Sequence, residues 1–162
     1  MATEEVVGLL CTAETFRPAG HEEVRWLDQE GDLALYAEAF YRQIGAEPPS
    51  REDWEAWHQE GYRYCGLVRG PAILTRAAVW SYSDTAWELA AVMTQPDHRG
   101  QGYARLVCSF ATAQILAAGR TATCHTAATN TAMLRVAEHL GYRRHSLEHW
   151  SKASSPDKGE DP

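Results

Sequence analysis

The sequence predicts an α+β fold in a single domain, with a mixed, mostly antiparallel central sheet flanked by helices. Three observations support this prediction. Residues 62–70, 72–80 and 86–93 carry apolar side chains at alternating positions, which is the pattern of β-strands. The breaks between these segments are short, so consecutive strands are expected to run antiparallel. Helical apolar patterns lie before and after them, which places helices against the sheet.

The elements before these strands follow from local signals. Residues 6–10 form a short apolar run typical of a strand, and residues 32–44 carry apolar side chains at helical spacing. Ser50, with Asp53 three residues later, marks the start of a second helix.

The elements after the three strands alternate between helix and strand. Residues 102–118 and 130–140 are predicted helices, and residues 120–127 and 142–150 are predicted strands. A helical crossover leads into residues 120–127, so this strand should run parallel to residues 86–93. The inward face expected for the first of these helices comprises Leu106, Val107, Phe110, Ala113, Leu116 and Ala117.

Composition narrows the class of protein. The chain has 162 residues, 44% of them apolar, and a formal net charge of −7. That charge argues against nucleic acid or an anionic membrane as the main partner. The four cysteines are widely spaced without metal-like pairing, as in reduced cytoplasmic proteins, and no apolar run reaches the roughly 18 residues that span a bilayer. We expect a cytoplasmic protein with one domain over residues 1–150 and a disordered tail over residues 151–162.

A glycine-containing loop, TQPDHRGQG at residues 94–102, joins a predicted strand to a predicted helix. The first amides of a helix have no partner inside it, and the helix dipole adds partial positive charge there, so such a loop suits a phosphate or pyrophosphate. Gly100 and Gly102 leave the backbone open to close approach, and Arg99 adds a side-chain donor. By itself, a Gly-x-Gly before a helix is more typical of an ordinary turn.

The surrounding residues give this loop a more specific interpretation. Arg99-x-x-Gly102-x-Ala104 fits the pattern Q/R-x-x-G-x-G/A, and the chain here resembles the GCN5-related N-acetyltransferase (GNAT) family. Downstream, Asn130 opens a helix that ends at Gly141 and an aromatic residue, which is similar to the second cofactor segment of that family. The resemblance covers residues 86–143. It implies a GNAT-like fold and acetyl-CoA as acyl donor, bound by Val92, Met93, Arg99, Gly100, Gln101, Gly102, Tyr103, Ala104 and Asn130.

The resemblance also implies the chemistry. In this family an amine attacks the thioester directly, with no metal, and a backbone amide near Val92 or Met93 would face the thioester oxygen. Glu88 is the candidate general base, because strict alternation would place it on one face with Ala90 and Val92. It also precedes Arg99 by eleven residues, the spacing of the strand glutamate in the histone-modifying members. A solvent-facing or salt-bridged strand residue is the alternative for Glu88.

One position departs from the family pattern. Relatives commonly carry a tyrosine four residues before the glycine–aromatic pair, where it protonates the leaving thiolate, but this chain has Ala137 there. Tyr142, Cys124, His145 or a water are the open substitutes, with Tyr142 as the catalytic candidate. The sequence therefore supports two hypotheses. The first is an N-acetyltransferase that acts on a primary amine of a small molecule or peptide and that could form a homodimer, as many relatives do. The second is a non-catalytic acyl-CoA binding module.

Two further groups of residues have competing interpretations. Trp54 and Trp57 lie among acidic residues of the second helix, so they could line a pocket for a cationic amine or simply bury the helix. Cys124 and His125 are neighbours on a strand and should face opposite sides, which argues against a Cys–His nucleophile pair.

Overall fold

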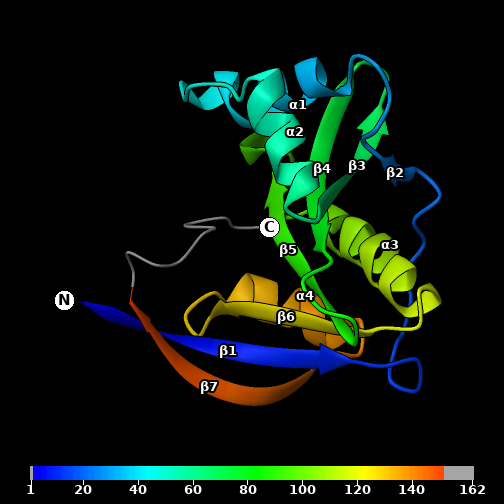
Figure 1. The fold of residues 1–162 in the computed structure, drawn as a ribbon, viewed down its shortest axis with the longest axis vertical. Helices are drawn as coiled ribbons and strands as arrows, with labels where there is room; N and C mark the ends of the chain where they lie inside the picture. Colours follow the sequence, from blue (N-terminus) through cyan, green and yellow to red (C-terminus); the bar gives the residue numbers. More distant parts are fainter. Residues whose placement is uncertain (1, 152–162) are drawn as a thin grey trace.

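A computed structural model describes residues 2–151 of the chain. Of the tail expected at residues 151–162, Ser151 is the last residue of β7, and residues 152–162 lie outside the described range. The strands form one sheet of seven in the order β2-β3-β4-β5-β6-β1-β7 (Figure 1). Their bounds are β1 Thr3–Cys11, β2 Val24–Trp26, β3 Tyr62–Arg69, β4 Ala72–Trp80, β5 Ala86–Thr94, β6 Thr121–Ala127 and β7 Arg143–Ser151. The predicted α+β class and the mostly antiparallel sheet are confirmed.

The β5–β6 pair is the parallel pair of this sheet, and it is short. Residues Ala86–Leu89 pair with Thr121–Cys124, whereas β5 continues alongside β4 as far as Thr94 and β6 continues alongside β1. Figure 1 shows β5 and β6 running in different directions beyond this contact. The sheet therefore has two antiparallel halves joined by a few residues, and both strands have unshared edges where they separate.

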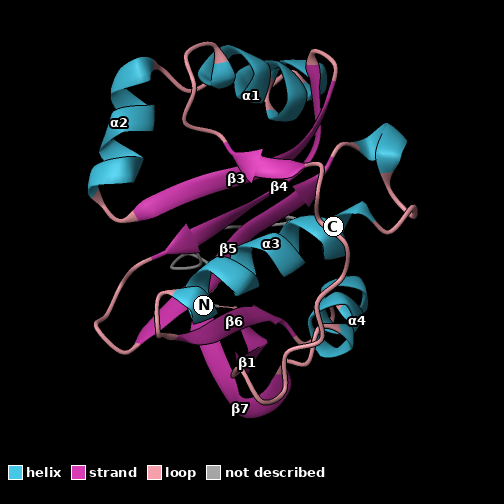
Figure 2. Ribbon diagram, turned by 90° about the vertical axis from the view of Figure 1, so that its right-hand side faces the viewer, coloured by secondary structure: helices cyan, strands magenta, loops and turns pink. Residues whose placement is uncertain are grey.

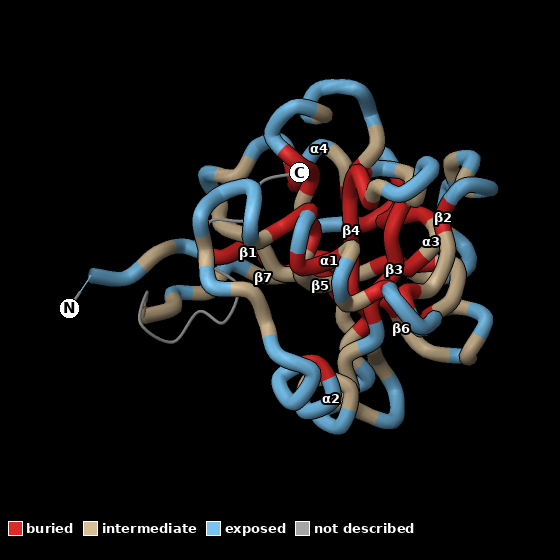
Figure 3. Tube along the Cα trace, turned by 90° about the horizontal axis from the view of Figure 1, so that it is seen from above, coloured by how far each residue is buried: buried red, intermediate tan, exposed pale blue. Residues whose placement is uncertain are grey.

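The helices cover the two faces of the sheet unequally. The helices are α1 Asp32–Phe40, α2 Arg51–Gln59, α3 Tyr103–Ala117 and α4 Thr131–His139, with 3₁₀ turns η1 Arg42–Ile44 and η2 Pro96–His98. One hydrophobic core packs α3 and α4 against the sheet, and a second packs α1 and α2 against β3 and β4 on the other face (Figure 2). Buried residues concentrate on the central strands between these layers (Figure 3). Within residues 2–151, no helix covers the face of β6, β1 and β7 opposite the first core.

Helix starts and strand pairing follow the expected local chemistry. Ser50 and Asp53 form the reciprocal capping pair at the start of α2, and β6 runs parallel to β5. The predicted helix at residues 32–44 breaks at Tyr41 into α1 and η1, and the three-residue strand β2 was not predicted. No helix in residues 2–151 is long and apolar enough to cross a bilayer.

The buried face of α3 differs from the prediction. Its fully buried residues are Ala104, Val107, Cys108, Ser109, Ala111, Thr112 and Ile115, most of them small. Leu106, Phe110 and Leu116 pack only at the margin of the core, and Ala117 is exposed. Small side chains let α3 lie close to the sheet, so the larger apolar residues are displaced to the sides of the contact.

Strict alternation along β5 is also wrong, because the strand contains a bulge. Ala90 pairs with Ala78 and Met93 with Arg76, so β5 has one residue more than β4 between these pairs, and Ala91 has a φ of 54°. Val92 consequently joins Leu89 in the core beneath α3, while Ala91 and Met93 pack against the core beneath α1 and α2. Glu88 and Val92 therefore lie on opposite faces, contrary to the sequence prediction.

Candidate functional site

The loop before α3 presents bare backbone to solvent. Gly102 is the residue before the first turn of α3 with φ 81°, and Gly100 has φ 77°. A Cβ added at either glycine would meet no other atom within 4 Å. Among the described residues, the amides of residues 100–105 donate no hydrogen bond outside the helix itself. The loop is thus an open cradle of donors at a positive helix end, which suits a pyrophosphate.

The side chains around the cradle have distinct positions. Arg99 and Gln101 are exposed, and Arg99 Nε donates to the carbonyl of Thr94 at 3.2 Å, which leaves the rest of its guanidinium facing outward. The hydroxyl of Tyr103 accepts from Arg69 Nη1 at 2.8 Å. Ala104 is buried in the core beneath α3, so only its backbone can serve a ligand.

The bulge at Ala91 is held by a buried arginine. Arg76 is 4% exposed, its Nε donates to the carbonyl of Ala91 at 3.0 Å, and its guanidinium lies over the ring of Phe40. The C=O and N–H of one trans peptide point in opposite directions, so the N–H of Val92 points away from Arg76. Val92 lies beyond the last β5–β6 pair, at the edge where the strands have separated.

Glu88 faces the opposite side of the sheet from the core beneath α3. It pairs across the strands with Trp80 on β4 and Thr123 on β6, so these side chains share a face. The Thr123 hydroxyl donates to Glu88 Oε1, and His125 Nδ1 lies 2.9 Å from Oε2. The hydrogen bond to Glu88 raises the pKa of His125, which favours an imidazolium beside the carboxylate.

Two of the substitutes considered for the missing acid, Tyr142 and Cys124, lie in the core beneath α3, on the face of the sheet opposite Glu88. Tyr142 is 2% exposed, its hydroxyl is hydrogen-bonded to that of Thr112 at 2.7 Å, and burial raises its pKa well above the usual value. Burial likewise raises the pKa of Cys124, which lies in the core beneath α3. Ala137 is fully buried in the same core. Tyr142 is therefore a packing residue whose hydroxyl is a weak acid.

Two other predictions concern single residues. The side chain of Asn130 accepts from the amide of Met133 at 3.1 Å, so it caps α4. Cys124 and His125 face opposite sides of β6, as expected, which separates the thiol from the imidazole. All four cysteines are free and buried. No cluster of metal-ligating side chains occurs within the described residues.

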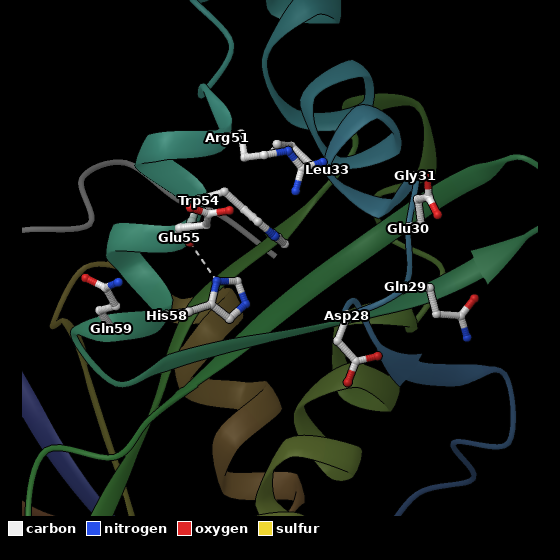
Figure 4. A pocket seen from close by; sticks show the side chains of 10 residues that line it. All are labelled: Asp28, Gln29, Glu30, Gly31, Leu33, Arg51, Trp54, Glu55, His58 and Gln59. Atoms are coloured by element: carbon white, nitrogen blue, oxygen red, sulfur yellow. Dashed lines mark hydrogen bonds between the residues drawn. The ribbon is translucent and has the colours of Figure 1, made fainter.

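The hollow beside the second helix is lined by Trp54 as well as by acidic residues, which fits both interpretations of this helix. Trp54 is 8% exposed and stacks on Tyr64 with ring centroids 5.1 Å apart, so it mainly buries α2. A hollow of about 630 Å³ between the start of α1 and α2 is lined by acidic residues, among them Asp28, Glu30 and Glu55 (Figure 4). The ring of His58 turns toward its own helix, with Nδ1 2.6 Å from the carbonyl of Trp54.

A match to a protein-family model shows which family the chain belongs to. The model of the FR47-like proteins, a GNAT-related family, matches residues 64–151, which is more than half of the chain and includes the bulge, the open cradle and the Glu88 face. The chain belongs to the GNAT family.

Solved structures show the same fold. A GNAT-family protein from Novosphingobium aromaticivorans superposes with a TM-score of 0.72 at 18% identity, covering 92% of this chain and 63% of its own. A GNAT-family acetyltransferase from Colwellia psychrerythraea gives 0.69 at 18% identity, covering 93% and 57%. An acetyltransferase from Trypanosoma brucei gives 0.62 at 18% identity, covering 78% and 95%. This GNAT chain thus spans less than two thirds of the length of the first two proteins. A comparison with curated protein sequences gave no match.

Several residues of the candidate site were not recognised in the sequence. In the sequence Arg76 is a polar residue within a predicted strand, and no neighbouring residue indicates that its guanidinium contacts the bulge of β5. Thr123 contacts Glu88, and Glu148 contacts His125, only through strand pairing between segments far apart in the sequence. The single available signal was the alternation of β6, which places His125 and Thr123 on one face.

Proposed function

We propose that this protein is an N-acyltransferase that moves an acetyl group from acetyl-CoA to a primary amine, with direct attack of the amine on the thioester. The observation that carries this proposal is the bulge at Ala91. It lies at the edge where β5 and β6 separate and is joined by β5 to the open cradle before α3.

Both backbone groups and side chains of the protein would contact acetyl-CoA. The cradle at Gly100–Gly102 and the first amides of α3 would hold the pyrophosphate, with the exposed guanidinium of Arg99 beside them. The backbone of Val92 and Met93 would lie along the pantetheine arm, and Asn130 would face it from α4. When bound, acetyl-CoA supplies an activated acyl group.

The catalytic contribution of the chain is orientation and charge. The N–H of Val92 is the donor that we assign to the thioester oxygen, and the hydrogen bond from Arg76 to the Ala91 carbonyl polarises the same peptide group. Glu88 is the group that we assign as base for the attacking amine. Its side chain is 12% exposed, so it can be reached while remaining largely shielded from water.

The acceptor face suits a positively charged amine. Trp80 lies opposite Glu88 in the strand register, and its ring stacks on Tyr62 with centroids 5.3 Å apart. Aromatic faces next to carboxylates attract ammonium groups. The amine of a small molecule and that of a peptide both match this chemistry.

The test is release of free CoA thiol by purified protein mixed with acetyl-CoA and a panel of primary amines, including amino-terminal peptides. Thiol release that depends on both partners supports the proposal. The second candidate function, a non-catalytic acyl-CoA binding module, is favoured by Ala137 and by the buried hydroxyl of Tyr142. Tight binding of acetyl-CoA without thiol release for any amine would select that function instead.

A further inference from the structure

The uncovered face of the sheet carries a continuous chain of polar side chains that begins at Glu88. His125 Nδ1 lies 2.9 Å from Glu88 Oε2, and the other ring nitrogen of His125, Nε2, lies 3.3 Å from Glu148 Oε2. Glu88, His125 and Glu148 belong to β5, β6 and β7. The imidazole therefore joins two carboxylates across a large part of the sheet.

A glycine makes the second contact of this chain possible. β1 lies between β6 and β7, and Gly8 is the β1 residue that pairs with His125 on one side and Ser146 on the other. A Cβ at Gly8 would overlap Ser146 Oγ and lie 3.2 Å from Glu148 Oε2 and 3.3 Å from His125 Nε2. Only a residue without a side chain lets His125 reach Glu148 over the intervening strand.

The far carboxylate is itself fixed in place. Ser146 Oγ donates to Glu148 Oε2 at 2.9 Å, and Trp150 Nε1 donates to Glu148 Oε1 at 3.0 Å. The same indole stacks on His125 with ring centroids 5.6 Å apart. The hydrogen bond from Trp150 is the main cause of a lowered pKa of Glu148, so this carboxyl is ionised beside His125.

From these contacts we infer that His125 and Glu148 are positioning residues for the reaction, because they orient the Glu88 carboxylate toward the attacking amine. Glu88 and, to a smaller extent, Glu148 raise the pKa of His125, and protonated His125 donates from Nδ1 to Glu88 while the Thr123 hydroxyl donates to the same carboxylate. The titratable groups that face His125 are Glu88 on β5 and Glu148 on β7, with Glu4 further along β1 on the same face. This inference rests on the proposed function of Glu88.

The orienting role makes a specific prediction for two variants at one position. In His125→Asn the amide nitrogen replaces Nδ1 and retains the donor to Glu88, whereas in His125→Gln it replaces Nε2 and retains only the contact with Glu148. We expect His125→Asn to keep kcat within a few-fold of the wild type. His125→Gln should lower kcat by up to about 10²-fold, with an unchanged KM for acetyl-CoA, because the base is misplaced.

The pH profile distinguishes positioning from packing. In the wild type the rate should fall in part as the pH rises through the raised pKa of His125, because a neutral imidazole has one N–H and cannot donate to Glu88 and Glu148 at once. Glu148→Gln removes a negative neighbour, so this descending limb should move to lower pH, while His125→Asn should abolish it. Gly8→Ala should resemble Glu148→Gln. Gly20→Ala is the control, because Gly20 is not in the left-handed region and a Cβ there would meet only the side chain of Glu22.

A readout without turnover completes the test. The pKa of His125 is followed by NMR of its imidazole in the wild type, Glu88→Gln and Glu148→Gln, and should fall in both variants. An unchanged pKa in Glu148→Gln, or a kcat of His125→Asn as low as that of His125→Gln, overturns the inference. A wild type that transfers no acetyl group to any amine overturns the proposed function instead, since the NMR titration decides the coupling without catalysis.

Discussion

The candidate sites on the two sides of β5 are built in different ways. On the side of α3, the candidate cofactor site is made of consecutive residues, Arg99–Ala104, and uses main-chain donors. On the opposite side, the candidate acceptor face is made of single side chains from different strands, such as Glu88 on β5 and His125 on β6. The first site is encoded in one short segment, whereas the second exists only after the sheet has assembled.

The sharpest way to test the backbone side is Gly102→Asp. The substitution places a Cβ at φ 81° and adds a negative charge where the phosphates would lie, so acetyl-CoA affinity should fall by more than about 100-fold. Isothermal titration calorimetry measures the loss. Gly31→Asp is the matched control, because Gly31 also precedes a helix with positive φ and open space, and it should bind normally. Equal affinities in the two variants would remove the cradle from the site.

The side-chain face is tested most directly by Glu88→Gln. Loss of the base should lower kcat/KM by about 10²-fold, and most strongly at lower pH, where more of the amine is protonated. Steady-state rates across pH, with acetyl-CoA and an accepted amine, measure the effect. Glu138→Gln, at an exposed glutamate of α4, should leave the profile unchanged. If Glu88→Gln has the same rate as the wild type at every pH, water and not Glu88 takes the proton from the amine.

Arg76→Lys tests the link between the two sides. The lysine cannot donate to the Ala91 carbonyl as Arg76 Nε does, so the bulge peptide should lose polarisation and kcat should fall about tenfold. Acetyl-CoA affinity should change little. Tyr36→Phe removes the hydroxyl next to Arg76 Nη1 and leaves the bond to Ala91, so it is the matched variant. If both variants have the same kcat after normalisation for folded protein, the bond to Ala91 has no catalytic effect.

The smallest expected effect concerns stability. Since folding raises the pKa of His125, its contribution is complete below about pH 6.5 and is lost as the pH rises through the raised value. Chemical unfolding at several pH values should show this loss in the wild type. Glu88→Gln should flatten it, because the main cause of the shift is removed. A loss of the same size in Glu88→Gln would mean that other groups dominate the pH dependence.

The same contrast explains what the sequence could predict. Strand order around β5, the capped start of α2 and the cradle before α3 follow from neighbouring residues, and they were predicted. The bulge at Ala91 was not, because alanine has no local preference for positive φ and the conformation is held by Arg76 from another strand. The placement of Val92 on the face of Glu88 failed for this reason.

The role of Tyr142 illustrates a second limit. The sequence shows a hydroxyl near the end of α4, but whether it faces a ligand or the core depends on how α3 packs. The small residues of α3 let the helix approach the sheet, and Thr112 then accepts or donates a hydrogen bond inside the core. Side-chain volume on one helix thus decides the environment of a residue 30 positions away.

The place of β1 between β6 and β7 has a consequence for assembly. A strand from the start of the chain can complete its ladders only after the last strand is present, so those contacts have long sequence separations. The cofactor loop can form around α3 from nearby residues, but Glu148 reaches His125 only when the two ends of the domain have come together. Competence to bind the donor should therefore appear earlier in folding than competence to use it.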